Sequence, residues 1–214
     1  MHLGPRFADA LRLAHELHAG QMRKASNVPY ISHLLAVTAT VLEFGGTEDT
    51  AIAALLHDAV EDCGGQATLE LIRNQFGDRV ASLVLDCSDT TESPKPPWSE
   101  RKTRYLEHLP KADPAALLIS AADKLHNLQS LVREERRHGV KLWGFFRAGR
   151  DGTLWYYARL LTIFRRRGLP EALLDQVETA YAELEQGILS QHRDSQIELP
   201  RPEQHATDPS KKLG

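Results

Sequence analysis

The sequence predicts an all-α fold, a single compact multi-helix bundle. Apolar residues recur at helical spacing along most of the 214 residues, and no segment alternates polar and apolar residues as a half-buried strand does. Apolar residues make up 42% of the chain, which is enough for a sizeable core. We therefore expect one domain over residues 1–189. The polar, proline-containing residues 190–214 are expected to form a disordered tail.

Glycines and capping residues delimit the first predicted helices. Residues 7–19 have apolar side chains at helical spacing and are followed by Gly20, a natural helix stop. Ser32 can cap a second helix over 33–44. Thr47 can cap a third helix, whose acidic first turn suits the helix dipole. We expect this third helix to continue through the sequence HDAVED at residues 57–62.

The rest of the chain is predicted to alternate between helices and two loops. Segment 89–98 contains three prolines and should be an exposed loop. Asp113 followed by Pro114 is a start signal for a long helix. Glycines interrupt segment 139–152, which should be the second loop. The remaining helices are expected over residues 68–76, 78–87, 99–108, 114–137, 153–167 and 170–189.

Charge and cysteine content exclude several classes of protein. The net charge is −3 and the pI is near 6.4, so no global field attracts nucleic acid or an anionic membrane. Cys63 and Cys87 form no disulfide framework, which favours a reducing, cytoplasmic setting. The first residues lack the apolar segment of a signal peptide, and no apolar run approaches the ~20 residues that span a bilayer. We expect a soluble protein with no nucleic-acid or membrane partner.

The HDAVED stretch concentrates ionisable side chains. On a helix, Glu61 follows His57 by one turn and Asp62 follows Asp58 by one turn, so these residues share a face. Carboxylates this close raise one another's pKa unless a cation neutralises them. A histidine beside an aspartate can begin a divalent metal site, and the later acids can manage protons. The alternative is a frayed helix end in water, but the helix dipole disfavours acids at a C-terminal end.

Two residues elsewhere can complete such a site. Asp123 follows the apolar run 117–119 and is expected to face inward, where an unpaired carboxylate is unfavourable. His33 alone is more typical of a capping or surface histidine, but its presence with HDAVED and Asp123 favours a ligand. Two imidazoles and two carboxylates without a thiolate suit Mn²⁺, Fe²⁺ or Zn²⁺ at a catalytic centre. An activated water beside Glu61 and Asp62 would make the site hydrolytic.

Basic residues upstream of His33 favour an anionic substrate. Arg23, Lys24 and Ser26 supply two cations and a hydroxyl, and an arginine can stack on a base. Without the metal motif, the same residues would suit an ordinary solvated loop. The basic run 133–150 is interleaved with glutamates, which weakens a nucleic-acid interpretation. The aromatic run 155–157 is more typical of a core than of ligand stacking.

Three ordered motifs resemble a known family. His33, the His-Asp pair at 57–58 and Asp123 are similar to the pattern of HD-domain metal phosphohydrolases. The longer segments GQMRKASNVPYISH (20–33), HDAVED (57–62) and ADKLHN (122–127) resemble the hydrolase domain of RelA/SpoT homologues. The resemblance covers about residues 7–185. Nothing resembles the synthetase or regulatory domains, so the chain looks like a stand-alone small alarmone hydrolase.

The resemblance implies a reaction and a role for each matched residue. The reaction is removal of the 3′-pyrophosphate of ppGpp or pppGpp, giving GDP or GTP and pyrophosphate, with Mn²⁺ as the metal. Glu61 and Asp62 would position or deprotonate the attacking water and assist phosphorus–oxygen cleavage. The metal ligands would be His33, His57, Asp58 and Asp123. The nucleotide contacts would be Arg23 on the guanine, Lys24 and Ser26 in the pocket, Asn127 at the ribose or base edge, and Arg147, Arg150 and Tyr157 at phosphates.

The chain departs from the family in the basic loop. The family usually has Arg-Lys-Gly-Ser-Gly, and this chain has Ala25 and Asn27 at the two glycine positions. We expect Asn27 to keep the turn, because asparagine tolerates a left-handed backbone. Close alternatives retain the site and change the substrate to an adenine alarmone such as ppApp or to the 2′-phosphate of NADPH. A non-catalytic alarmone sensor is a different class, and the complete set of ligands and acids argues against it.

Overall fold

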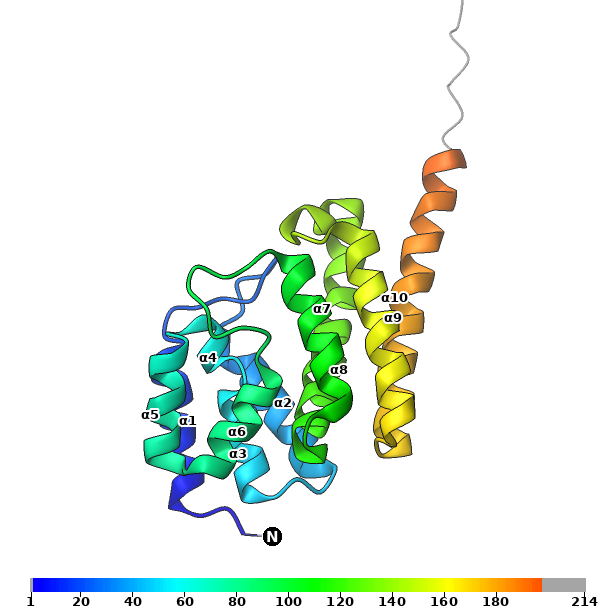
Figure 1. Ribbon diagram of the computed structural model, residues 1–214. Helices are drawn as coiled ribbons and strands as arrows, with labels where there is room; N and C mark the ends of the chain where they lie inside the picture. The colour runs from blue at the N-terminus through cyan, green and yellow to red at the C-terminus, as the bar shows by residue number, and fades with distance from the viewer. Residues whose placement is uncertain (1, 198–214) are drawn as a thin grey trace, which may run out of the picture.

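The computed structural model describes residues 2–197, and helices joined by loops make up this range (Figure 1). The predicted all-α fold is confirmed, since this range contains no β-strand and only an isolated antiparallel bridge between Met22 and Pro29. Within it, no helix is both long enough and apolar enough to cross a membrane. The elements are α1 (Pro5–Leu17), α2 (Ile31–Glu43), α3 (Glu48–Leu56), α4 (Ala59–Asp62), α5 (Gln66–Phe76), α6 (Asp78–Cys87), α7 (Trp98–His108), η1 (Leu109–Lys111), α8 (Pro114–His138), η2 (Gly139–Phe145), α9 (Gly149–Arg167) and α10 (Glu171–Ile197).

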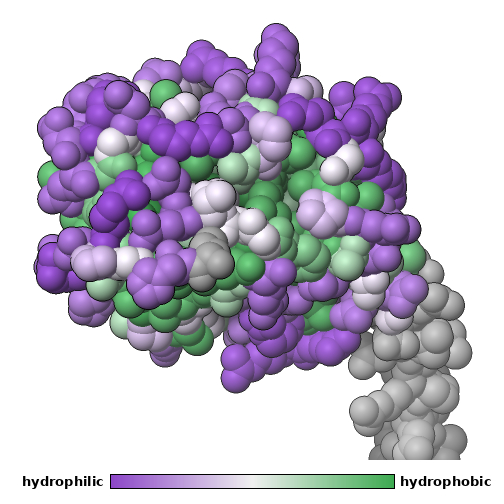
Figure 2. Space-filling view, turned by 90° about the horizontal axis from the view of Figure 1, so that it is seen from below, coloured by the Kyte–Doolittle hydropathy of each residue, from purple (hydrophilic) through white to green (hydrophobic). Residues whose placement is uncertain are grey.

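Helix α8 is the central element of the bundle. It packs against α2, α3, α6, α9 and α10. The predicted start signal is confirmed, because the Asp113 carboxylate accepts a hydrogen bond from the Ala115 amide at 2.8 Å. The helix carries Asp123 into the core, where 6% of this residue is exposed. Seen from below, hydrophilic residues form the rim of the molecule and hydrophobic residues show between them, as expected for helices that turn apolar faces inward (Figure 2).

The helix that carries HDAVED ends earlier than predicted. Thr47 caps α3 as expected, with its hydroxyl oxygen accepting from the Thr50 amide at 3.3 Å. However, α3 ends at Leu56, and a turn at 57–58 separates it from the short helix α4. At this turn the His57 imidazole Nδ1 is hydrogen-bonded to the carbonyl of Ala54 at 2.8 Å. The prediction of one continuous helix was therefore wrong, and the histidine–aspartate pair and the later acids lie on different elements.

Other predicted boundaries also change. Tyr30, not Ser32, occupies the N-cap position of α2, and no side chain caps this helix. Segment 139–152 is not a loop throughout, because it contains η2 and the first turn of α9. Helix α10 continues to Ile197, past the predicted helix end at 189. The disordered tail expected over 190–214 stays a prediction, and residues 198–214 of it lie outside the described residues.

Candidate active site

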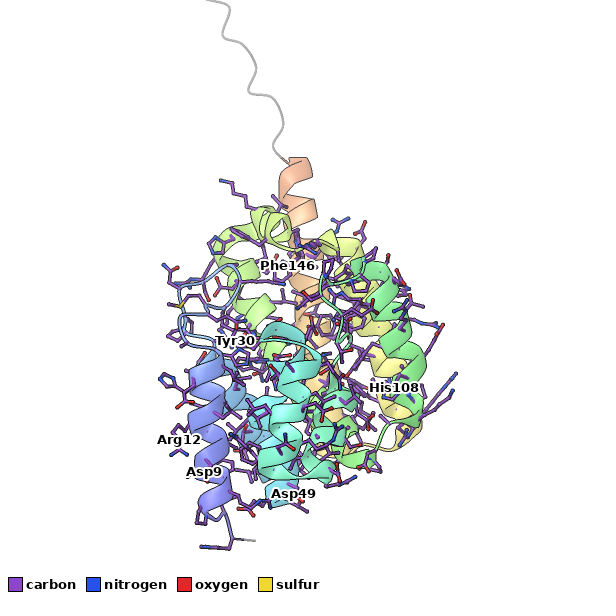
Figure 3. All side chains as sticks on the ribbon, turned by 60° about the vertical axis from the view of Figure 1, so that its left-hand side comes forward. Asp9, Arg12, Tyr30, Asp49, His108 and Phe146 are labelled. Carbon is purple, nitrogen blue, oxygen red and sulfur yellow. The ribbon has the colours of Figure 1, made fainter. Side chains whose placement is uncertain are left out.

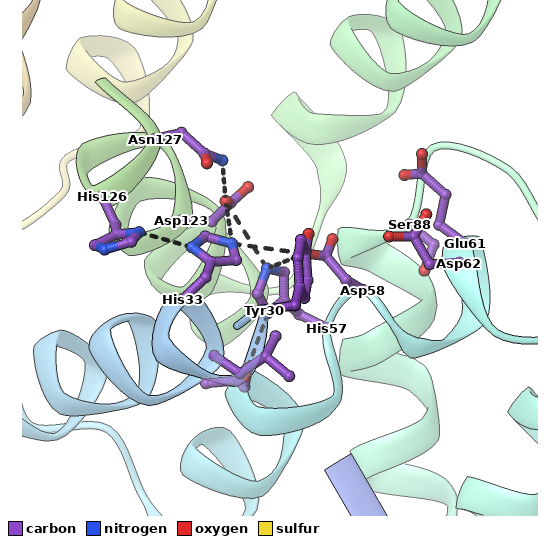
Figure 4. A network of polar contacts seen from close by, with 12 residues as sticks. Tyr30, His33, His57, Asp58, Glu61, Asp62, Ser88, Asp123, His126 and Asn127 are labelled. Carbon is purple, nitrogen blue, oxygen red and sulfur yellow. Dashed lines mark hydrogen bonds and ion pairs between the residues drawn. The ribbon is translucent and has the colours of Figure 1, made fainter. Parts of the chain in front are cut away.

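Four side chains from three parts of the bundle meet at one point (Figure 4). His33 comes from the first turn of α2, His57 and Asp58 from the turn after α3, and Asp123 from α8. Asp58 Oδ2 lies 3.1 Å from His57 Nε2 and 3.5 Å from His33 Nε2. Asp123 Oδ1 lies 3.2 Å from His33 Nε2 and 3.8 Å from His57 Nε2. Ligand atoms of His33, His57 and Asp58 all lie within 4.8 Å of one another.

The imidazoles are oriented for a cation. The Nε2 atoms of His33 and His57 are buried and have no hydrogen-bond partner in the structure, an arrangement that is unfavourable unless a metal takes the lone pairs. The opposite nitrogens are both engaged, His57 Nδ1 with the Ala54 carbonyl and His33 Nδ1 with His126 Nδ1, each at 2.8 Å. Burial lowers the pKa of His126 to about 4. Its ring is therefore neutral at pH 7 and can accept a hydrogen bond from His33 Nδ1.

The electric field in the cluster favours a positive charge. Burial lowers the pKa of His57, but the nearby charges of Asp58 and Asp123 outweigh burial and raise this pKa to about 10. Burial raises the pKa of Asp58, yet the facing imidazoles hold it well below its usual range. Burial raises the pKa of Asp123 too, but Lys124 and the two imidazoles together hold it well below its usual range. Two ionised carboxylates and two oriented imidazole nitrogens fit a divalent metal ion.

A second pair of carboxylates, Glu61 and Asp62, lies beyond Asp58 on the side away from His126 (Figure 4). Lys95 bridges this acid pair, with Nζ 3.1 Å from Glu61 Oε1 and 2.7 Å from Asp62 Oδ1. Arg101 also donates to Glu61 Oε1 at 3.2 Å, and Gln21 donates to Asp62 Oδ2 at 3.0 Å. Burial raises the pKa of Glu61, although neighbouring lysines oppose the shift. A raised pKa suits proton transfer near neutral pH.

Sequence reasoning missed the cations that hold the acid pair. Lys95 lies in the proline-rich loop between α6 and α7, where local spacing indicates only exposure. Arg101 lies on α7, 6% exposed, and also contacts Asp89. The backbone at Gly65 lets the loop approach, because a Cβ there would come within 2.5 Å of the Thr91 carbonyl oxygen. Only the packing of this loop on α4 brings the cations to the acids.

Comparison with known proteins agrees with this site. The family model described as HD domain matches residues 10–154, which is more than half of the chain. The chain belongs to the HD domain family. In this HD-domain chain, the matched range includes the four-residue cluster and the acid pair.

Named relatives share this part of the chain. A guanosine-3′,5′-bis(diphosphate) 3′-pyrophosphohydrolase, MESH1 of Xenopus tropicalis, is 41% identical over 58% of this chain and 69% of its own length. The Homo sapiens MESH1 is 38% identical over the same shares. A probable GTP pyrophosphokinase of Mycobacterium leprae is 38% identical over 57% of this chain, but over only 15% of its own length.

Solved structures support the fold. A structure described as that of a metazoan orthologue of SpoT that hydrolyses ppGpp has a TM-score of 0.69 at 26% identity, covering 88% of this chain and 99% of that chain. A Listeria monocytogenes protein has a TM-score of 0.61 at 31% identity, covering 74% of this chain and 99% of that chain. Both likenesses extend over nearly the whole of the other molecule.

The basic loop between α1 and α2 lies against the metal cluster. Arg23 donates to Asn127 Oδ1 at 2.6 Å, and Asn127 in turn donates to Asp123. Ser26 lines a surface cavity of about 920 Å³ together with Ala25, Asn27, Val28, Arg137, His138 and Phe145. The left-handed residue of the loop is Ala25, with φ 60°, so the expectation that Asn27 keeps the turn was wrong. Ala25 occupies the first of the two positions where the family usually has glycine.

The predicted phosphate contacts of the later segment lie in different environments. Tyr157 is buried at 7% exposure; burial raises its pKa, and the charges of Lys124 and Asp123 also act on it. Arg150 instead lines a cavity of about 290 Å³ between η2, α9 and α10, with Nε 2.7 Å from Asp151. Arg147 is exposed. The phosphate roles of these residues stay predictions.

Proposed function

We propose that this HD-domain protein is a metal-dependent hydrolase that removes the 3′-pyrophosphate of ppGpp and pppGpp, giving GDP or GTP and pyrophosphate. The observation that carries the proposal is a set of four candidate metal-ligand side chains, three of them buried, beside a separate, cation-bound acid pair. Relatives named as 3′-pyrophosphohydrolases of this nucleotide are 38 to 41% identical to the chain and support the reaction.

We assign the metal to His33, His57, Asp58 and Asp123, and we favour Mn²⁺ over Fe²⁺ or Zn²⁺. The unpartnered imidazole nitrogens support this assignment, and the mixture of nitrogen and oxygen ligands without thiolate suits Mn²⁺. Such an ion supplies Lewis-acid stabilisation of phosphate oxygens and a lowered pKa for water. Both carboxylates remain ionised without a metal, so their oxygens are available as ligands.

Glu61 and Asp62 serve as the proton-handling groups in this proposal. The oxygen of water forms a bond to the phosphorus attached to the ribose 3′-oxygen, and the bond between that phosphorus and the 3′-oxygen breaks. Water loses one proton and the leaving 3′-oxygen gains one, so a single carboxyl group can accept and return it. The raised pKa of Glu61 favours this residue for the transfer. Asp62, held by Lys95 and Gln21, would orient the water.

Basic side chains of the chain would bind the nucleotide. Arg23 would stack on the guanine and Asn127 would hold the ribose or base edge, while Lys24 and Ser26 line the pocket. Arg147, Arg150 and Tyr157 are proposed as phosphate contacts. The partner is then a small anionic nucleotide rather than a nucleic acid or a membrane. Both cysteines are free, which supports a reducing, cytoplasmic setting.

Product analysis tests the function directly. Purified protein would be incubated with Mn²⁺ and, in parallel, ppGpp, pppGpp, ppApp and NADPH. We expect GDP or GTP together with pyrophosphate from the guanine nucleotides. If only NADPH were turned over, with release of orthophosphate, the metal site would still be supported but the proposed substrate would be wrong. Bound Mn²⁺ with no turnover of any compound would favour a nucleotide sensor.

A further inference from the structure

Tyr30 is the residue at which the metal cluster and the basic loop meet. It lies partly buried where the loop after α1 enters α2, while residues such as Asp9 and Arg12 point outward from α1 (Figure 3). Its hydroxyl group and its ring face two different neighbours. The two contacts involve groups that the proposed function assigns to different tasks, the metal and the nucleotide.

The hydroxyl group is directed at a candidate metal ligand. Tyr30 donates to Asp58 Oδ2 at 2.6 Å, and the same oxygen faces the Nε2 atoms of His33 and His57. A hydrogen bond to a charged carboxylate is short and strong, and it restricts rotation of the carboxylate. The hydroxyl of Tyr30 therefore selects the position of the Asp58 oxygen that faces the imidazoles.

The ring of Tyr30 supports the basic loop. The Arg23 guanidinium carbon lies 5.6 Å from the ring centroid, within the range of a cation–π contact. Arg23 also donates to Asn127, and Asn127 donates to Asp123, so the path continues to the second metal carboxylate. Asp58, Tyr30, Arg23, Asn127 and Asp123 thus form one chain of contacts that begins and ends at the metal cluster.

Two histidines hold the ring in place. His18 stacks on one face, with centroids 5.1 Å apart and an interplanar angle of 17°. His33 meets the ring edge-on at 5.5 Å and 71°. His18 is itself fixed by Gln21 Oε1, 2.7 Å from its Nδ1. A ring packed between two histidines has little freedom to reorient. The hydroxyl contact with Asp58 and the ring contact with Arg23 are therefore held in a fixed geometry.

We propose that Tyr30 is a positioning residue that serves both halves of the site: its hydroxyl holds Asp58 for the metal, and its ring holds Arg23 for the nucleotide. The nucleotide half rests on the proposed function, whereas the metal half requires only that the cluster binds a divalent ion. Tyr30→Phe removes the hydroxyl and keeps the ring, whereas Tyr30→Leu removes both groups, so the difference between the two variants reports on the ring.

Calorimetric titration with Mn²⁺ tests the hydroxyl. Outer hydrogen bonds to metal ligands typically contribute about 10-fold to 100-fold in metal affinity, so we expect Tyr30→Phe to weaken Mn²⁺ binding about 10-fold. Tyr181→Phe is the matched control, because its hydroxyl donates to the Leu154 carbonyl at 3.5 Å and interacts with Glu185 on α10, outside the metal cluster. Equal Mn²⁺ affinity in Tyr30→Phe and wild type, with equal melting temperatures, would overturn the proposal that the hydroxyl positions Asp58 for the metal.

Titration with GDP in metal-free buffer tests the ring. Cation–π contacts are worth about 0.5–1 kcal/mol at partly exposed sites, so we expect Tyr30→Leu to bind GDP a few-fold more weakly while Tyr30→Phe binds like the wild type. Equal affinity of all three proteins would overturn the ring's role. Failure of the wild type to bind GDP would count against the proposed function instead, and the Mn²⁺ titration would still decide the role of the hydroxyl.

Discussion

The two carboxylate pairs of the site differ in the groups that face them. Asp123 is buried and Asp58 is partly buried; both face two imidazoles and have lowered pKa values. Glu61 and Asp62 lie on the short helix α4 and face a lysine and an arginine from outside the metal cluster. The pKa of Glu61 is raised by burial. One pair is therefore suited to holding a cation and the other to moving a proton.

This division shows how one short segment supplies two kinds of chemistry. HDAVED contributes Asp58 to the first pair and both members of the second pair. On one continuous helix these residues would share a face and repel one another. The turn between α3 and α4 separates them, and each pair then has its own cationic partners. The predictions below alter one pair at a time.

Removal of a metal carboxylate should have the largest effect. Asp58→Ala deletes an oxygen that faces both imidazole nitrogens, so we expect loss of stoichiometric metal and of turnover to background. Metal content would be measured by elemental analysis after gel filtration. Asp9→Ala on the surface of α1 serves as a control, because Asp9 pairs with Arg12 on the same helix and lies outside the site. A metal-replete, active Asp58→Ala protein would contradict the ligand assignment.

Removal of the proton-handling charge should leave the metal in place. Glu61→Gln has nearly the same shape and retains a hydrogen-bond acceptor for Arg101. General acid–base groups contribute about 10²- to 10⁴-fold to rate, and we expect a loss of kcat in that range with unchanged metal content. Single-turnover kinetics with ppGpp would measure it. An unchanged kcat would show that Glu61 does not transfer the proton.

Replacing Lys95, which contacts both Glu61 and Asp62, should change the pH dependence of kcat more than its maximum value. Lys95 lowers the pKa of Glu61 against the effect of burial, so Lys95→Met should raise this pKa further. If Glu61 acts as the base, activity is lost as pH falls through its pKa, and the acidic limb of the kcat profile should move to higher pH. Lys111→Met, outside the site, is the control. A limb that stays in place would exclude Lys95 as the residue that tunes Glu61.

The smallest expected effect concerns the loop that serves both pairs. Arg23 contacts Asn127 of the metal side, and the charge of Lys24 interacts with Asp62 and Glu61. Between Lys24 and Ser26, Ala25 has a positive φ of 60°, a region unfavourable for residues with a Cβ. Ala25→Gly should relieve about 1 kcal/mol of strain, which urea unfolding would detect as a higher midpoint. A lower midpoint would mean that the greater entropy of unfolded glycine dominates.

Local pattern predicted most helices and all four candidate metal ligands. Asp113–Pro114 and Thr47 are signals confined to a few neighbouring residues, so the two helices that depend on them start where predicted. The capping prediction at Ser32 failed because Tyr30 packs and hydrogen-bonds to Asp58, which places α2 two residues earlier. Helix α10 runs past the predicted end, and residues 190–197 contain no glycine or proline that would stop it.

The sequence by itself determined which residue types could bind a metal and that helices would carry them, because those properties depend on composition and short spacing. Only the tertiary structure decided that α3 ends before His57, that Lys95 and Arg101 neutralise the acid pair, and that Tyr30 joins Asp58 to Arg23. These contacts connect segments that are far apart along the chain. They arise from how helices and loops pack, and no local periodicity contains that information.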